Sequence, residues 1–170
     1  MKILLFVLAG VALLILAVVA IGSLLPKQHV ASRSASYHAT LEALFSLIAG
    51  AQTWRPDVQH CEVTTDAQGR ELMRETTRDG HTITYALVES VPPRSLKRQI
   101  VTPNLPYSGA WTYSLTATGE TTAVRITENG EVYNPFFRFV SRFILGHTST
   151  MDAYLRALGK ATGQDVVITN

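Results

Sequence analysis

Cysteine is almost missing from this 170-residue sequence, in which Cys61 is the only one. A single thiol cannot form an internal disulfide, so cysteine usage does not indicate a redox compartment. Cys61 shares its strand parity with Val63 and has polar neighbours on either side. This setting predicts a buried, unreactive thiol rather than a catalytic nucleophile.

Charged residues are also scarce. They make up 16% of the chain and leave a formal net charge of +2. No cluster of lysine and arginine concentrates that charge, so a nucleic-acid partner is not expected. The 5 histidines lack the paired spacing of metal sites, and we expect neither a metal nor another cofactor. Nucleophile elbows, phosphate-binding loops and dinucleotide fingerprints are missing too, so motifs identify no catalytic residue.

Apolar residues are concentrated at the N-terminus. Residues 3–25 contain no charged side chain, and at about 1.5 Å per residue such a helix matches a hydrocarbon core of about 30 Å. A cleaved signal peptide is the alternative, but the run exceeds the roughly 7–15 apolar residues of such peptides. No cysteine follows for lipoprotein processing, and Pro26 ends the helix. We predict a membrane anchor over residues 1–26, a domain over 27–160 and a tail over 161–170.

The flanking charges say little about which side of the membrane carries the domain. Lys2 favours a cytoplasmic N-terminus, whereas Lys27 and Arg33 flank the other end of the apolar run. The signal-anchor pattern favours an exported domain, on the periplasmic side of a bacterial inner membrane. A cytoplasmic domain is the alternative. Protein partners and oligomeric state are left open.

The rest of the sequence predicts one α+β unit. Thr40 is a suitable cap for a short helix over residues 41–49, with Leu44 and Ile48 on its buried face. Alternating segments rich in β-forming residues follow, and the short turns between them favour antiparallel neighbours. The predicted strands cover residues 29–36, 58–65, 71–77, 82–90, 95–101, 109–117 and 121–132.

A second helix is predicted to cover this sheet. Asn134 followed by Pro135 is a typical helix start. Apolar residues then recur at helical spacing from Phe136 to Leu158, which predicts one uninterrupted helix of about 25 residues. Its first turns hold an excess of phenylalanine. Burial under neighbouring loops, gating of a pocket and contact with lipid are three explanations for that excess.

Several segments resemble a known superfamily. They are Trp54-Arg55-Pro56, Ser108–Tyr113, Thr127–Val132, Asn134–Phe139 and Asp152–Leu155. With this order of elements they are similar to the SRPBCC superfamily, which includes START lipid-transfer domains and polyketide cyclases/dehydrases. The resemblance covers roughly Val30 to Gly159. It implies a helix-grip fold, in which a curved antiparallel sheet wraps around a long C-terminal helix and leaves a cavity for an apolar molecule. The superfamily shares no catalytic motif, so the resemblance assigns no activity.

Candidate ligand-binding residues lie on the predicted inner face. Glu128 and Arg98 share parity with apolar neighbours on their strands, so they should form an ion pair on the covered face. That pair is interpreted either as structural or as a polar anchor for a ligand. His147 is either a core histidine or a group that reaches the cavity. The candidate set is Tyr85, Arg98, Trp111, Tyr113, Glu128, Phe139, Phe143 and His147.

Three functions fit these observations. The favoured one is a noncatalytic module that binds a lipid or other hydrophobic small molecule beside the membrane. An enzyme of the cyclase/dehydrase kind is the second, with Glu128 or His147 as acid or base. The third is an envelope interaction protein in which the domain is only a scaffold. A solid core of aromatic side chains, without any cavity, is the structural alternative to a binding site.

Overall fold

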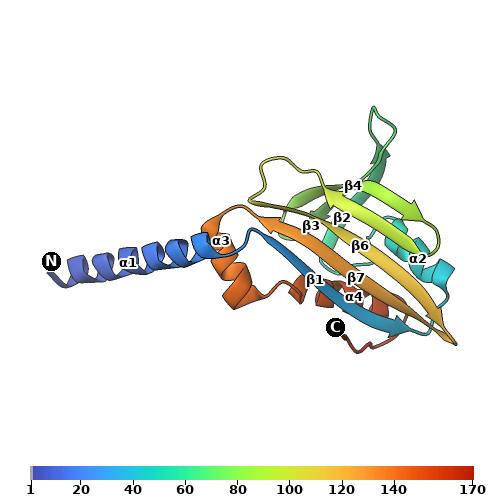
Figure 1. Ribbon diagram of the computed structural model, residues 1–170. Helices are drawn as coiled ribbons and strands as arrows, with labels where there is room; N and C mark the ends of the chain where they lie inside the picture. The colour runs from blue at the N-terminus through green and yellow to red at the C-terminus, as the bar shows by residue number, and fades with distance from the viewer. Residues whose placement is uncertain (1) are drawn as a thin grey trace.

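The computed structural model describes residues 2–170, except for the side chain of Leu145. Its elements follow the predicted order (Figure 1). The helices are α1 (Lys2–Leu24), α2 (Leu41–Ala49), α3 (Pro135–Val140), the π-helical turn η1 (Ser141–Leu145) and α4 (Ser149–Ala161). The strands are β1 (Gln28–Tyr37), β2 (Val58–Thr65), β3 (Glu71–Thr77), β4 (Thr82–Val91), β5 (Ser95–Ile100), β6 (Tyr107–Thr118) and β7 (Thr121–Val132).

The strands form one curved antiparallel sheet in the order β1-β7-β6-β5-β4-β3-β2 (Figure 1). Consecutive strands from β2 to β7 are neighbours, and β1 adds to β7 at one edge. The residues after α4 return to that edge, where Thr169 and Ser34 exchange two backbone hydrogen bonds of 2.9 Å. The predicted antiparallel helix-grip architecture is therefore confirmed.

Helices α2 and α4 pack on the inner face of the sheet and form the core with β1, β6 and β7. Thr40 caps α2 as predicted, because its hydroxyl accepts a hydrogen bond from the amide of Ala43. The phenol of Tyr37 donates to the carbonyl of Leu155 at 2.9 Å, so a buried polar group of β1 is satisfied by α4. Fully buried core residues include Leu44, Ile48, Val124, Ile126, Met151, Leu155 and Leu158.

The prediction of one continuous C-terminal helix is wrong. Asn134 caps α3 through its side chain and Pro135 follows at the first turn, as expected. The helix then passes into η1 and breaks at Gly146, whose φ of +72° lies in the left-handed region that only glycine adopts without strain. A new helix, α4, begins at Ser149. The apolar stripe is thus divided between a buried part in α4 and an exposed part in η1.

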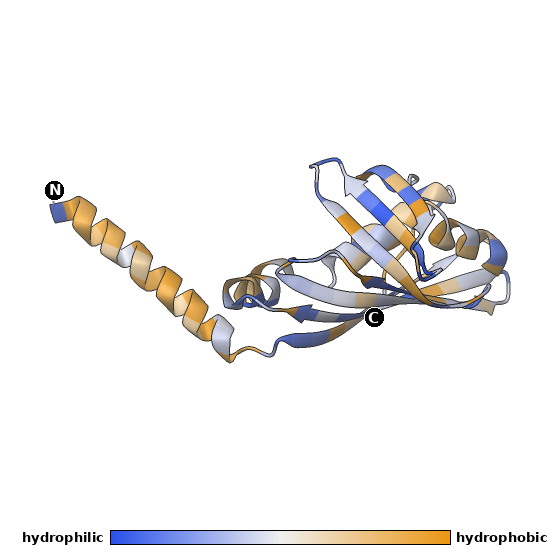
Figure 2. Ribbon diagram, turned by 90° about the horizontal axis from the view of Figure 1, so that it is seen from above, coloured by the Kyte–Doolittle hydropathy of each residue, from blue (hydrophilic) through white to orange (hydrophobic). Residues whose placement is uncertain are grey.

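Helix α1 projects away from the domain as a separate rod with an apolar surface along its length (Figure 2). It has 23 residues and only apolar or small side chains after Lys2, which makes it long and apolar enough to cross a membrane. Its C-terminal part contacts α3 of the domain. A Cβ on Gly22 would overlap the backbone carbonyl of Pro135, and Arg138 donates to the carbonyl of Leu25 at 2.8 Å. The end of α1 is therefore packed against α3.

Candidate functional site

A cavity of about 460 Å³ lies between the inner face of the sheet and the segment from α3 to α4. Side chains from β3, β4, β5 and β6 form its apolar wall. They are Met73, Ile83, Tyr85, Ile100, Trp111 and Tyr113. Such a volume and composition are typical of sites for small hydrophobic molecules, so the alternative of a solid core does not hold.

Most of the predicted candidates line this cavity. They are Tyr85, Arg98, Trp111, Tyr113, Glu128 and His147. Phe139 and Phe143 do not, and the structure places them outside it. Their rings pack on each other with centroids 4.9 Å apart, and Phe143 is 59% exposed. Both phenylalanines precede the break at Gly146, so they do not belong to α4, the helix that packs on the inner face of the sheet.

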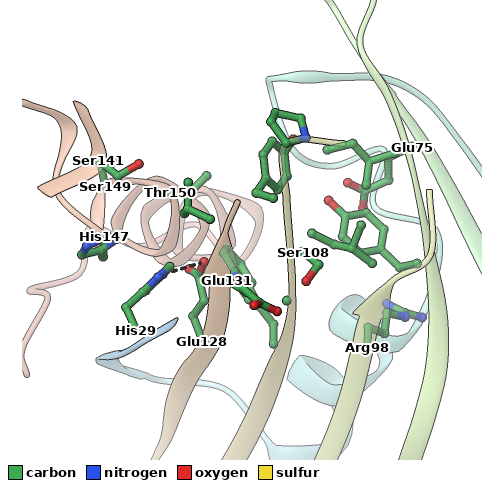
Figure 3. Close-up of a pocket in the computed structure, with 18 of the residues that line it drawn as sticks. His29, Glu75, Arg98, Ser108, Glu128, Glu131, Ser141, His147, Ser149 and Thr150 are labelled. Atoms are coloured by element: carbon green, nitrogen blue, oxygen red, sulfur yellow. Dashed lines mark ion pairs between the residues drawn. The ribbon is translucent and has the colours of Figure 1, made fainter. Parts of the chain in front are cut away.

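One end of the cavity holds two histidines and a glutamate (Figure 3). The Nε2 of His29 lies 3.4 Å from a carboxylate oxygen of Glu128, and its ring stacks on that of His147 with centroids 3.9 Å apart. Gly130 makes room for this arrangement, since a Cβ there would overlap the His29 ring. Partial burial and the neighbouring His29 lower the pKa of His147. The lowered pKa favours the neutral imidazole of His147.

His29 was not predicted, although a signal for it exists. It shares parity in β1 with Ala35 and Tyr37, which are both buried. Val30, the only strongly apolar residue in the first half of β1, has the other parity and would place His29 on the outer face, yet Val30 is 71% exposed. The shared parity of His29 with Ala35 and Tyr37 identifies the inner face correctly.

The opposite end of the cavity holds buried charges (Figure 3). Glu75, whose side chain is 3% exposed, accepts a hydrogen bond of 3.0 Å from Arg55. Arg55 also pairs with Asp57, and Gln52 joins this group through a contact to Arg55. The parity of Glu75 with Met73 in β3 could have indicated an inward carboxylate.

The predicted ion pair between Arg98 and Glu128 is wrong. Arg98 instead pairs with Glu71 at 3.0 Å and donates to the backbone carbonyls of Ile48 and Ala49. The register places Trp111 opposite both Arg98 and Glu128, so these two charges are separated by a whole strand. Parity identifies the face of a side chain, but only the register identifies its neighbours.

Three tyrosines near the buried charges remain un-ionised at ordinary pH. Burial raises the pKa of Tyr85, Tyr113 and Tyr154 well above 10. Tyr154 accepts a hydrogen bond from Gln52 at 3.0 Å and packs edge-on against Trp111. These phenols therefore offer neutral hydroxyls and ring surface rather than nucleophiles.

Cys61 is buried, as predicted, and its sulfur accepts a hydrogen bond from the amide of Gln52 at 3.3 Å. Burial raises the pKa of this thiol, which leaves it protonated and unreactive at neutral pH. Among residues 2–170 no group of three or more potential ligands is arranged to hold a metal ion.

Stability should depend on pH through Glu75. Burial raises the pKa of its carboxyl above the usual 4.5, so the folded state binds a proton more tightly than the unfolded one. The stability due to that proton is complete below pH 4.5 and is lost as the pH rises through the folded pKa. Unfolding of wild type and Glu75→Gln by denaturant from pH 4 to 8 should show wild type losing stability relative to the variant as the pH rises. A constant difference would contradict this assignment.

The family described as polyketide cyclase/dehydrase and lipid transport matches residues 28–161. The chain belongs to this family. The match begins at the first residue of β1 and ends at the last residue of α4, so it includes the whole sheet and both faces of the cavity. No curated protein matches this sequence.

Several solved structures share the fold of this family member. A START superfamily protein from Mycobacterium smegmatis superimposes with a TM-score of 0.63 at 14% identity, covering 79% of this chain and 97% of that one. Norcoclaurine synthase from Thalictrum flavum gives 0.61 at 16% identity, with 79% and 86% covered. A conserved protein from Geobacillus kaustophilus gives 0.63 at 13%, with 84% and 100% covered. At these identities the likeness extends to the fold alone.

Proposed function

We propose that this protein is a membrane-anchored, noncatalytic module that binds a lipid or another hydrophobic small molecule in its cavity. The observation that carries the proposal is an apolar, aromatic-walled space of about 460 Å³ in a domain joined directly to α1. A binding site of this kind gains affinity from apolar contact area, while a few polar groups orient the ligand. The description of the family as polyketide cyclase/dehydrase and lipid transport supports it.

The proposal includes α1 as a single membrane span that remains attached. Its side chains are exposed to the surroundings from Ile3 to Leu24, except near the contact of Gly22 with α3. A helix with this surface is stable in lipid and not in water. N-terminal sequencing of the full chain purified from membranes should return the intact N-terminus. A mature chain that begins after residue 25 would identify a signal sequence instead.

The binding function is tested on the full chain extracted into nanodiscs without detergent. Organic extraction and mass spectrometry should find one class of hydrophobic molecule enriched over empty nanodiscs, in an amount comparable to that of the protein. Native mass spectrometry should show the same mass as an adduct. An adduct-free protein after exposure to a broad lipid panel would refute the proposal.

A second candidate function is catalysis of the cyclase/dehydrase kind. The observation that favours it is the contact between Glu128 and His29, with His147 stacked on the same ring. A carboxylate that orients an imidazole in a partly buried cavity is an arrangement used for general acid–base chemistry. Their side chains are 16% exposed for His29 and 22% for Glu128, so a bound molecule could reach them.

The substitution Glu128→Gln separates the two functions. If the site is only a binding site, the affinity of the variant for its ligand should stay within about tenfold of wild type, because the hydrogen bond of a partly exposed group contributes on the order of 0.5–1.5 kcal/mol. If it is an acid–base site, turnover of a supplied ketone or polyketide substrate should fall by roughly 100-fold or more while binding persists. Ligand content and turnover are measured on the same preparation, and Glu62→Gln on exposed β2 is the control.

A further inference from the structure

An exposed apolar surface lies on α3 and η1, next to the end of α1. It consists of Phe136, Phe137, Phe143 and Ile144, which are 43%, 44%, 59% and 68% exposed. Four large apolar side chains exposed together in such a short segment form a patch that usually marks an interaction site. We call it the α3–η1 patch.

The contacts of α1 determine where this patch lies relative to the bilayer. Gly22 packs against the carbonyl of Pro135, and Arg138 donates to the carbonyl of Leu25. The last turn of the apolar helix is therefore in contact with the first turn of α3. An apolar span of 23 residues fills the hydrocarbon core, so its end lies at the boundary between acyl chains and headgroups. Helix α3 is held at the same depth.

The composition of the segment suits that depth. Phenylalanine and isoleucine side chains gain free energy by entering the acyl boundary, and Arg142 and Lys27 can reach the headgroups beside them. Exposure of these four apolar side chains to water costs free energy, and a bilayer at this position would remove that cost by covering them. In Figure 2 the apolar colour of α1 recurs on α3, the short helix beside its end.

The cavity reaches the surface at the same place. Phe137 belongs to the patch and also lines the cavity, together with Ser141, Gly146 and His147 of the following segment. Tyr107, a further lining residue, is 38% exposed on the adjacent end of β6. An opening at Phe137 and Tyr107 therefore lies beside the apolar patch and the end of α1.

From these contacts we infer that the α3–η1 patch is a second membrane contact, which seats the mouth of the cavity on the bilayer that α1 spans. The inference rests on the proposed function and deepens it, because a ligand then passes between cavity and bilayer without crossing water. The partner is the lipid surface itself. Its acyl boundary covers the patch, and its lipids supply or receive the bound molecule.

Depth measurement tests the contact. Cys61→Ser removes the native thiol, and Phe143→Cys or Val88→Cys then places one environment-sensitive fluorophore on the patch or on β4. Val88 is 52% exposed and does not line the cavity, which makes it a matched control. The full chain is placed in phosphatidylcholine nanodiscs that contain lipids with a quencher on the acyl chain. Quenching at position 143 and none at position 88 is expected; equal signals at both positions would overturn the inference.

The rate of ligand transfer tests whether the opening of the cavity faces the bilayer. The double substitution Phe143→Asp with Ile144→Asp should slow transfer of a pyrene-labelled fatty acid from donor vesicles by at least about tenfold. Its equilibrium affinity should stay unchanged, because neither residue lines the cavity. Val88→Asp should alter neither. An unchanged rate would refute the bilayer-facing mouth. If the fluorophore at position 143 is quenched but the pyrene-labelled fatty acid does not bind, the contact of the patch with the bilayer is supported. The proposed binding function and the route of ligand exchange are then both refuted.

Discussion

Replacing Arg55 with alanine is expected to lower the free energy of unfolding by about 3–5 kcal/mol, which is the usual cost of removing one partner of a buried ion pair. Glu75 is 3% exposed, and Arg55 is its ion-pair partner at 3.0 Å. Without the guanidinium, the carboxylate would lose its hydrogen bond in a place that water hardly reaches. Burial acts to lower the pKa of Arg55, but Asp57 and Glu75 raise it above its usual value, so the charge is present throughout the accessible pH range.

Chemical denaturation of the full chain at several pH values measures this effect. Arg70→Ala is the control, because Arg70 is 57% exposed and solvent screens its pair with Asp66, so the loss of stability should be small. The loss in Arg55→Ala should shrink at low pH, where Glu75 takes up a proton and no longer presents a buried charge. Equal, small losses for both variants would contradict the structural importance of the buried pair.

Replacing Ile83 with tryptophan is expected to empty the cavity of its ligand. Ile83 lines the cavity from β4 and points to the same face as Tyr85. An indole at this position would occupy space that the bound molecule needs, so the hydrophobic molecule recovered with the protein should fall to the level of empty nanodiscs. The fold should persist, because the larger side chain enters open space instead of a filled core.

Mass spectrometry of extracted lipids, with Val88→Trp as control, measures this effect. Val88 lies on the same strand but is 52% exposed and does not line the cavity. The control should retain its ligand, and both variants should keep melting temperatures within a few degrees of wild type. Retention of the full ligand content in Ile83→Trp would place the binding site elsewhere.

Most of the architecture could be predicted from local patterns. Alternation located the strands, since residues 58–65, 71–77 and 121–132 match β2, β3 and β7 as observed. The caps at Thr40 and Asn134 located two helix starts. These signals work because they depend on residues close together in sequence. The candidate cavity face was found by the same logic, through the parity of Tyr85, Trp111 and Tyr113.

The errors arise where distant residues decide the outcome. The apolar stripe continues through Gly146, so periodicity alone does not reveal the break between η1 and α4. The interpretation of Phe143 as a cavity residue was wrong because exposure on the α3–η1 patch and burial in a core both select apolar side chains. The partners of Arg98 and Glu128 depend on strand register, which no short segment of sequence specifies.

The place of β1 in the sheet has a consequence for how the protein is made. This strand follows α1 directly, yet its hydrogen-bonding partner is β7, with Gln28 opposite Glu131. The hairpins from β2 to β6 can form before β7, the partner of β1, has been synthesised. Closing so long a loop is entropically slow. The nascent domain is therefore expected to complete its sheet late, only after β7 has been synthesised.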